Sequence, residues 1–208
     1  MKIFQLPLGP LQTNCYLLGC EETKKAAVID PSWDGQLIAQ KAEDKGWEIT
    51  HILLTHAHFD HVGGLAELKE VTKAPSYIHP DAIPMLENAV LAAQMWQIQM
   101  PEPPPADYSI ADNQEIEVGN LSLRVLFTPG HAPGHVSFYL ADYHVIFDGD
   151  VLFQQSIGRT DLPGGDHDLL LQIIQRRLLV LPDETTVLSG HGPATTIGQE
   201  KLLNPFLQ

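Results

Sequence analysis

The stretch LLTHAHFDHVGG, residues 53–64, places three histidines and one aspartate within six positions. It continues an apolar run, ITHILLT, that indicates a buried strand, and it ends in a glycine pair. His56 and His58 are two residues apart, which on an extended segment places both side chains on one side. Asp60 and His61 follow where the chain turns into a helix, so they can face a second ion. Imidazole and carboxylate are ligand types that zinc and iron accept, so the sequence predicts a metal site at this strand end.

Three further apolar strands end at a glycine turn that carries the same kinds of residue. LRVLFTPGHAPGH offers His131 and His135, YHVIFDGDVLF offers Asp150, and TTVLSGHGP offers His191. Active sites of α/β proteins are commonly assembled on loops at strand ends. We therefore expect these residues to join residues 56–61 in one distributed site.

The bulk properties of the chain limit its class. Its 208 residues suit one domain, and twelve basic against twenty-six acidic side chains give a net charge of −14. Such a charge repels nucleic acid and anionic lipid, which counts against nuclease activity. No apolar window approaches the roughly 18 residues of a membrane span, and the N-terminus does not resemble a signal peptide. We expect a cytoplasmic protein, a monomer or weak oligomer, that binds neither nucleic acid nor membranes.

Strands and helices alternate along the chain, which favours a sheet core covered by helices. Cys15 and Cys20 are five apart on an expected strand, so they should point to opposite faces without forming a disulfide. Strands are expected at residues 2–8, 13–20, 24–31, 49–55, 74–80, 114–119, 121–128, 135–141, 143–149 and 185–190, and helices at 34–46, 63–73, 81–98 and 167–180.

The motifs resemble those of the metallo-β-lactamase superfamily, and within it the glyoxalase II-like (hydroxyacylglutathione hydrolase-like) thioesterases. The family pattern T-H-x-H-x-D-H stands at Thr55–His61, and TNCYL, TPGHAPGH, GDVLF, GRTDLPGGDH and GHGP match in order. The closing NPFLQ is similar to the short, single-domain bacterial hydrolases of this group. The resemblance implies an αββα sandwich, two mixed sheets flanked by helices, with metals between loops along one edge. It also implies one domain over residues 1–208, without the C-terminal helical glutathione-binding domain of longer glyoxalase II proteins.

The resemblance assigns seven metal ligands. It implies that His56, His58 and His131 hold a first ion, that Asp60, His61 and His191 hold a second, and that Asp150 bridges them. The family ligand follows the TPG turn, so it corresponds to His131, and His135 would lie beside the ligands or within the next strand. Seven ligands are too many for one tetrahedral zinc and fit two divalent ions. We expect zinc, with iron or manganese as alternatives, because His/Asp sites accept all three.

The implied activity is hydrolysis of a small-molecule thioester. A metal-bridging hydroxide would attack the thioester carbonyl of S-lactoylglutathione and give glutathione and D-lactate. Asp60 and Asp150 would be catalytic as well as liganding, by orienting the hydroxide. Arg159, in GRTDLPGG, is the candidate for substrate binding, although it could instead pair with Asp161 or Asp166. The apolar residues of 81–98 could line the mouth of the site or simply pack in the core.

An alternative on the same fold is a persulfide dioxygenase. Those relatives use one iron, bound by the counterparts of His56, His131 and Asp150, whereas this chain also retains Asp60, His61 and His191. A non-catalytic metal-binding module is disfavoured, because structural zinc sites are closed by four protein ligands. Lactamase activity is disfavoured by the lack of a secretion signal.

Overall fold

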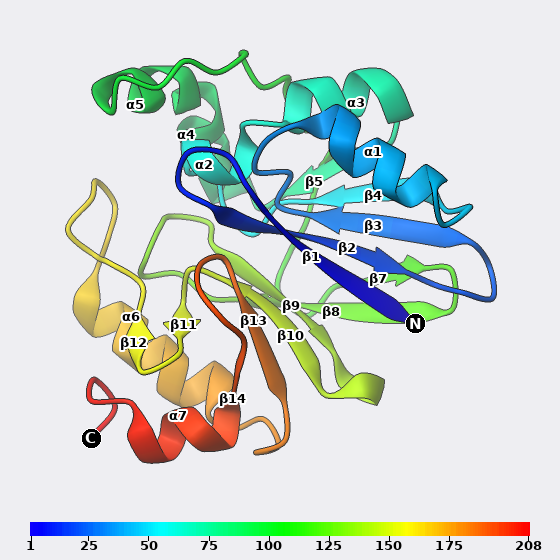
Figure 1. Cartoon of the computed structure of the whole chain (residues 1–208). Helices are drawn as coiled ribbons and strands as arrows, with labels where there is room; N and C mark the ends of the chain where they lie inside the picture. Colours follow the sequence, from blue (N-terminus) through cyan, green and yellow to red (C-terminus); the bar gives the residue numbers. More distant parts are fainter.

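The computed structural model describes residues 1–208 as two facing six-stranded sheets with helices on both outer sides (Figure 1). The first sheet has the order β1-β2-β3-β4-β5-β6. Its strands β1 to β3 are antiparallel, whereas β3 to β6 run parallel. The bounds are β1 (Lys2–Leu8), β2 (Thr13–Gly19), β3 (Lys25–Ile29), β4 (Glu48–Leu53), β5 (Ser76–Ile78) and β6 (Tyr108–Ser109).

The second sheet has the order β14-β13-β10-β9-β8-β7. Only β10 and β13 pair in parallel, so this sheet is also mixed. Its bounds are β7 (Glu115–Val118), β8 (Leu121–Phe127), β9 (Val136–Leu140), β10 (Val145–Gly149), β13 (Thr186–Ser189) and β14 (Thr195–Thr196). A separate small hairpin joins β11 (Leu152–Phe153) and β12 (Ser156–Ile157). The predicted αββα class, with two mixed sheets, is confirmed.

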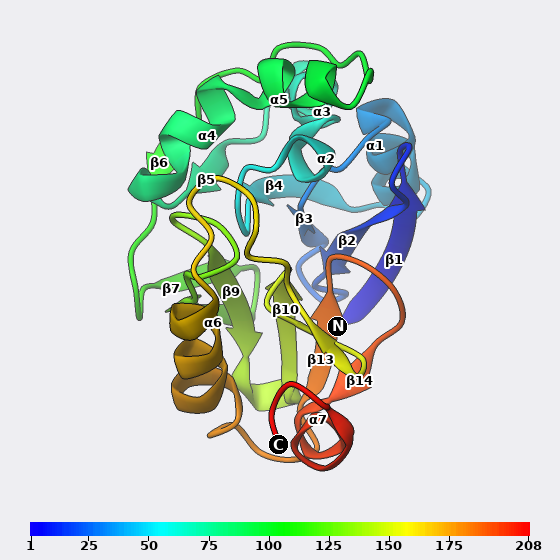
Figure 2. The ribbon, with the colours of Figure 1, turned by 90° about the vertical axis from the view of Figure 1, so that its left-hand side faces the viewer.

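The helices form the two outer layers, which Figure 2 shows above and below the pair of sheets. Five lie on the first sheet's side: α1 (Gly35–Glu43), α2 (Phe59–Val62), α3 (Leu65–Thr72), α4 (Ile83–Glu87) and α5 (Ala89–Met95). On the other side lie α6 (His167–Ile173), its π-helical continuation Ile174–Leu178, and α7 (Ile197–Leu203). Short 3₁₀ turns occur at Pro80–Ala82 and Ala141–Tyr143. No helix is long and apolar enough to cross a membrane.

Each of the three interlayer spaces has its own hydrophobic core. Strand β2 shows why, because alternate side chains of a strand point to opposite faces. Cys15 and Leu17 pack in the core under α1 and α3, whereas Tyr16, Leu18 and the following Cys20 pack between the sheets. Both cysteines are buried and unbonded on opposite faces, as predicted. A third core lies between the second sheet and the helices α6 and α7.

The prediction of one helix over residues 81–98 is wrong in detail. The segment consists of a 3₁₀ turn, α4 and α5, and the break falls at Asn88. The Asn88 side chain donates a hydrogen bond to the Pro84 carbonyl at 2.7 Å, and its N–H bonds to Met85, which closes α4 there. Four short strands and α7 were not predicted: β6, β11, β12, β14 and Ile197–Leu203.

Candidate metal centre

The turn after β4 is fixed by a buried carboxylate from the end of β3. Asp30, whose φ of 52° lies in the left-handed region, accepts hydrogen bonds from the Thr55 N–H at 2.7 Å and hydroxyl at 2.6 Å. Its Oδ2 also lies 2.8 Å from His61 Nδ1. A carboxylate on one ring nitrogen sets the tautomer and leaves the other nitrogen for a metal. Asp30 therefore orients His61, a role that was not predicted from the sequence.

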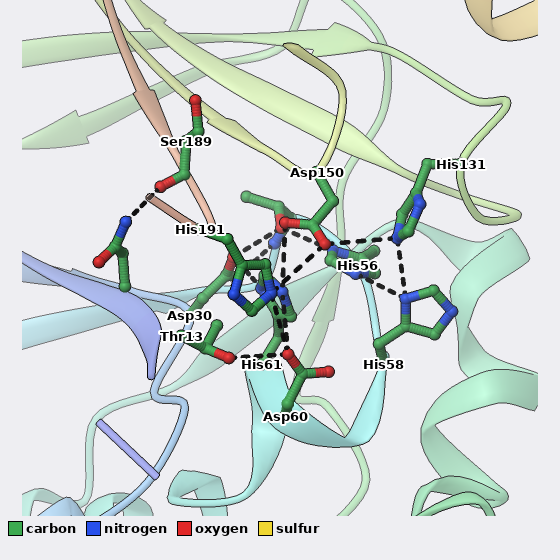
Figure 3. Close-up of polar contacts among 12 residues, drawn as sticks. Thr13, Asp30, His56, His58, Asp60, His61, His131, Asp150, Ser189 and His191 are labelled. Carbon is green, nitrogen blue, oxygen red and sulfur yellow. Dashed lines mark hydrogen bonds and ion pairs between the residues drawn. The ribbon is translucent and has the colours of Figure 1, made fainter. Parts of the chain in front are cut away.

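The first predicted set of ligands converges closely (Figure 3). His58 Nδ1 lies 3.0 Å from His56 Nε2 and 2.9 Å from His131 Nε2. His131 Nδ1 faces the Arg159 carbonyl at 2.7 Å, so its Nε2 is the nitrogen available to the site. Nitrogens bound to one tetrahedral zinc at about 2.05 Å lie roughly 3.3 Å apart. These three rings therefore stand close to the arrangement that one ion requires.

The second predicted set also meets. Asp60 Oδ2 lies 3.2 Å from His191 Nε2 and 3.6 Å from His61 Nε2. The Thr13 hydroxyl holds the same Asp60 oxygen at 2.7 Å. The three side chains offer atoms that all lie within 4.8 Å of one another. This set reaches the surface at His191, whose side chain is 32% exposed.

Asp150 lies between the two sets. Its Oδ2 is 3.6 Å from both His131 Nε2 and His191 Nε2, and its Oδ1 is 3.4 Å from His61 Nε2. Both His61 Nε2 and Asp150 Oδ1 are buried without a hydrogen-bond partner. Buried polar atoms are rarely left unpaired, so this pair has the chemistry of a cation site. The residues present fit a dinuclear centre with Asp150 as the shared carboxylate.

The other histidine of TPGHAPGH does not join either set. His135 Nε2 accepts a hydrogen bond from the Asp150 N–H at 3.1 Å, and its Nδ1 lies 3.0 Å from the Thr128 hydroxyl. Both ring nitrogens of His135 are thus engaged in hydrogen bonds, and neither faces the two sets.

The TNCYL stretch of β2 supports the turn that carries His191. The Asn14 side chain and the Tyr16 hydroxyl donate to the Ser189 carbonyl at 2.9 and 2.6 Å, and Asn14 N–H donates to the Gly190 carbonyl at 2.7 Å. No role for these residues was predicted from the sequence. Their position in a motif shared with the family was the available signal.

Of the two roles considered for Arg159 from the sequence, the structure shows the pairing with a neighbouring aspartate. The Arg159 guanidinium makes a bidentate pair with Asp161, with both N–O distances at 2.7 Å, and the side chain is 48% exposed. Exposed pairs of this kind contribute about 0–1 kcal/mol, so the guanidinium can exchange partners readily. Substrate binding by Arg159 stays a prediction.

The end of α5 lies beside the ligand-bearing helix α2. The Trp96 ring stands 6.1 Å from that of Phe59, the residue between His58 and Asp60. Met95 and Trp96 are exposed there. This segment therefore borders α2, whereas Ala89 and Ala93 of the same helix pack in the core.

Protonation differs between the two sets. Burial lowers the pKa of His131, burial with the neighbouring His61 holds the pKa of His56 well below its ordinary value, and burial with His131 lowers the pKa of His58 to about 4. In the second set burial opposes charge, but Asp150 and Asp60 outweigh it and raise the pKa of His61. Burial likewise disfavours charge on His191, yet the hydrogen bond to Asp60 raises its pKa.

These opposite shifts predict unequal acid lability of two bound ions. A histidine must be deprotonated to bind a metal, so a raised pKa makes proton competition stronger as the pH falls. In the pH range just above the ordinary histidine pKa of about 6.5, the second ion should be lost first as the pH falls, while the neutral histidines of the first set keep theirs. Bound metal per chain after dialysis across this range measures it. Loss of both ions in one step would contradict the unequal protonation of the two sets.

Comparison with known proteins agrees with the geometry. The family described as the metallo-beta-lactamase superfamily matches residues 8–191. The chain belongs to the metallo-beta-lactamase superfamily. Among superfamily members of known sequence, it is 39% identical to the Haemophilus influenzae hydroxyacylglutathione hydrolase GloC, over 100% of this chain and 98% of GloC.

Two superfamily crystal structures are similar over nearly their whole length. BLEG-1, described as a B3 metallo-beta-lactamase, is 43% identical with a TM-score of 0.93, and 99% of each chain is covered. TTHA1623 in a di-iron-bound form is 44% identical with a TM-score of 0.91, covering 98% of this chain and 100% of that one. Together with the geometry, these likenesses support a metal-dependent hydrolase with a dinuclear His/Asp centre and leave the metal's identity open.

Proposed function

We propose that this protein hydrolyses glutathione thioesters, with S-lactoylglutathione converted to glutathione and D-lactate. The observation that carries the hydrolytic part is the position of Asp150 between the two histidine sets, 3.4 to 3.6 Å from His61, His131 and His191. The glutathione part is supported by the likeness to GloC over the whole chain. The substrate is a small molecule, since the net charge of −14 disfavours nucleic acid.

The proposed ligands are the seven residues of the two sets. His56, His58 and His131 would hold one ion, Asp60, His61 and His191 the other, and Asp150 both. Two ions held there would supply a hydroxide nucleophile at neutral pH and would polarise the substrate carbonyl. Zinc fits the donor set, as do iron and manganese.

Asp60 and Asp150 are the carboxylates that can accept a hydrogen bond from the attacking water. Although burial opposes ionisation, the neighbouring His61 lowers the pKa of Asp60 to about 2 and lowers that of Asp150 further. Both are therefore ionised at neutral pH. The leaving group is a thiolate, whose ordinary pKa of about 8.5 makes a strong general acid unnecessary.

Arg159 is proposed to bind a carboxylate of the glutathione moiety. Its backbone carbonyl contacts His131, so its side chain starts from the rim of the first set. Arg159→Ala should lower kcat/KM for S-lactoylglutathione by about 10-fold, because it removes a hydrogen bond between charged groups. It should change a lactoyl thioester of a small neutral thiol by less than about 2-fold. Steady-state kinetics on both substrates measure this.

The matched control is Arg176→Ala, which removes an exposed arginine of the π-helical turn after α6. It should leave both substrates unaffected. Equal losses on the two substrates in Arg159→Ala would remove Arg159 from glutathione recognition.

The decisive assay follows thiol release from S-lactoylglutathione by the metal-loaded protein. Two other substrates are offered to the same sample. Nitrocefin tests a second candidate function, β-lactam hydrolysis, which the likeness to BLEG-1 favours. Oxygen uptake with glutathione persulfide tests the dioxygenase, a function in which Asp60, His61 and His191 would have no iron to hold. We expect thiol release at a higher kcat/KM than nitrocefin turnover, and no oxygen uptake.

A higher kcat/KM for nitrocefin, or oxygen uptake with glutathione persulfide, would overturn the proposal.

A further inference from the structure

Two hydrogen bonds fix both ends of the short segment that carries Asp150. At one end His135 Nε2 accepts from the Asp150 N–H at 3.1 Å. At the other end Asp148 Oδ2 accepts from the Leu152 N–H at 2.9 Å. His135 and Asp148 are fully buried, so neither bond has water as a competitor. The backbone around the bridging carboxylate is thus bonded to two buried side chains.

Two hydroxyl groups connect these side chains to each other. Thr128 Oγ1 lies 3.0 Å from His135 Nδ1 and 3.0 Å from Ser137 Oγ. Ser137 Oγ donates to Asp148 Oδ1 at 2.8 Å. Both hydroxyl residues are also fully buried. Together these hydrogen bonds form a ring. It runs from the Asp150 N–H through His135, Thr128 and Ser137 to Asp148, which also accepts from the Leu152 N–H.

The direction of each bond in this ring follows from its two fixed donors. A backbone N–H can only donate, so His135 Nε2 must carry a lone pair and the ring proton sits on Nδ1. The Nδ1–H then donates to Thr128, and the Thr128 hydroxyl is left to donate to Ser137. Each of these donors therefore meets an acceptor, and hydrogen-bonded networks of this kind make a buried structure rigid.

The fit of the backbone against the His135 ring is close. Gly149, between Asp148 and Asp150, has φ 54°. A Cβ at this position would stand 2.6 Å from His135 Nε2. The Gly149 carbonyl accepts from the Gly190 N–H at 2.7 Å, which ties the same segment to the turn before His191.

We propose that His135 is a positioning residue that holds the bridging carboxylate of Asp150 in place through this ring. The inference rests on the two-ion function proposed above, because it assigns Asp150 to both ions. His135 itself contacts no substrate and offers no nitrogen to a metal. Mutation of a residue that only orients a metal ligand commonly lowers metal affinity by about 10- to 100-fold.

The test compares two replacements of His135 that differ in one acceptor atom. His135→Gln can place Oε1 near the position of Nε2 and accept from the Asp150 N–H, whereas His135→Leu fills similar space without an acceptor. We expect His135→Leu to bind metal about 10- to 100-fold more weakly than the parent, and His135→Gln to recover most of that loss. Metal affinity is measured by competition with a chromophoric chelator, and the melting temperature of the metal-free proteins is measured alongside.

Thr128→Val provides a second, nearly isosteric variant in case the leucine variant does not fold. It removes the hydroxyl that receives the His135 Nδ1 proton, and we expect several-fold weaker metal binding. Parental affinity in Thr128→Val and both His135 variants would overturn the proposal. Equal losses in the leucine and glutamine variants would also overturn it, because packing alone would then explain them. Binding of fewer than two ions by the parent would instead contradict the proposed function.

Discussion

Replacing Asp150 by alanine is expected to lower thioester hydrolysis by more than about 100-fold, beyond the range of losses seen for residues that only orient a ligand. The reason is its position, since its two oxygens face His61 on one side and both His131 and His191 on the other. Bound metal should fall from two ions to one or fewer per chain. Elemental analysis and kinetics on the same preparation measure both effects.

The matched control is Asp142→Ala, an exposed aspartate in the turn between β9 and β10. It should keep two ions and full activity, which separates the loss of a ligand from the loss of one negative charge. Retention of two ions by Asp150→Ala would contradict the bridging role.

Gly190→Ala is expected to have the second large effect, although it adds a single methyl group. A Cβ at Gly190 would overlap Asp150 Oδ1 and stand 2.6 Å from His61 Cε1. Dense interiors accommodate added atoms only by displacing their neighbours, and here the neighbours are two candidate ligands. The variant should lose the ion held by His61 and Asp150, and with it activity by about 100-fold.

Gly192→Ala controls for this substitution two residues further along. Gly192 has φ 73° and no atom within 4 Å of the added Cβ, so alanine meets open space there. Because the backbone is left-handed there, alanine should lower the free energy of unfolding by about 1 kcal/mol and leave the metal content unchanged. Equal metal content in the two glycine variants would show that the metal ligands do not need the space left by the missing side chain of Gly190.

The sequence predicted those parts of the site that depend on local order. Each candidate ligand follows an apolar strand, and His131, Asp150 and His191 stand at glycine turns. Strands that end at one edge of a sheet bring such turns together. His56, His58 and Asp60 also lie within five residues of one another, so their proximity needs no knowledge of the fold. The ligand type and the strand position together carried this prediction.

The supporting contacts were not predictable in this way because they join distant positions. Asp30 reaches Thr55 and His61 across 25 and 31 residues, and only the parallel pairing of β3 with β4 brings them together. Thr13 likewise meets Asp60 from 47 positions away. Polar residues at strand ends have many possible partners, and the sequence alone does not select one.

Helix α7 was missed because its stability comes from tertiary contacts. Its Ile197 packs in the third core. Its Glu200 is buried and accepts hydrogen bonds from the Gln155 N–H and the Thr195 hydroxyl. Short helices gain most of their stability from packing, which a local pattern does not report.

The most direct test of a two-ion thioester hydrolase is a metal titration of the metal-free protein, with thiol release from S-lactoylglutathione as the readout. Activity should rise until two equivalents of metal per chain have been added and then remain constant, because both sets and the shared Asp150 are needed. A plateau at one equivalent, or no thiol release at any metal content, would contradict the account.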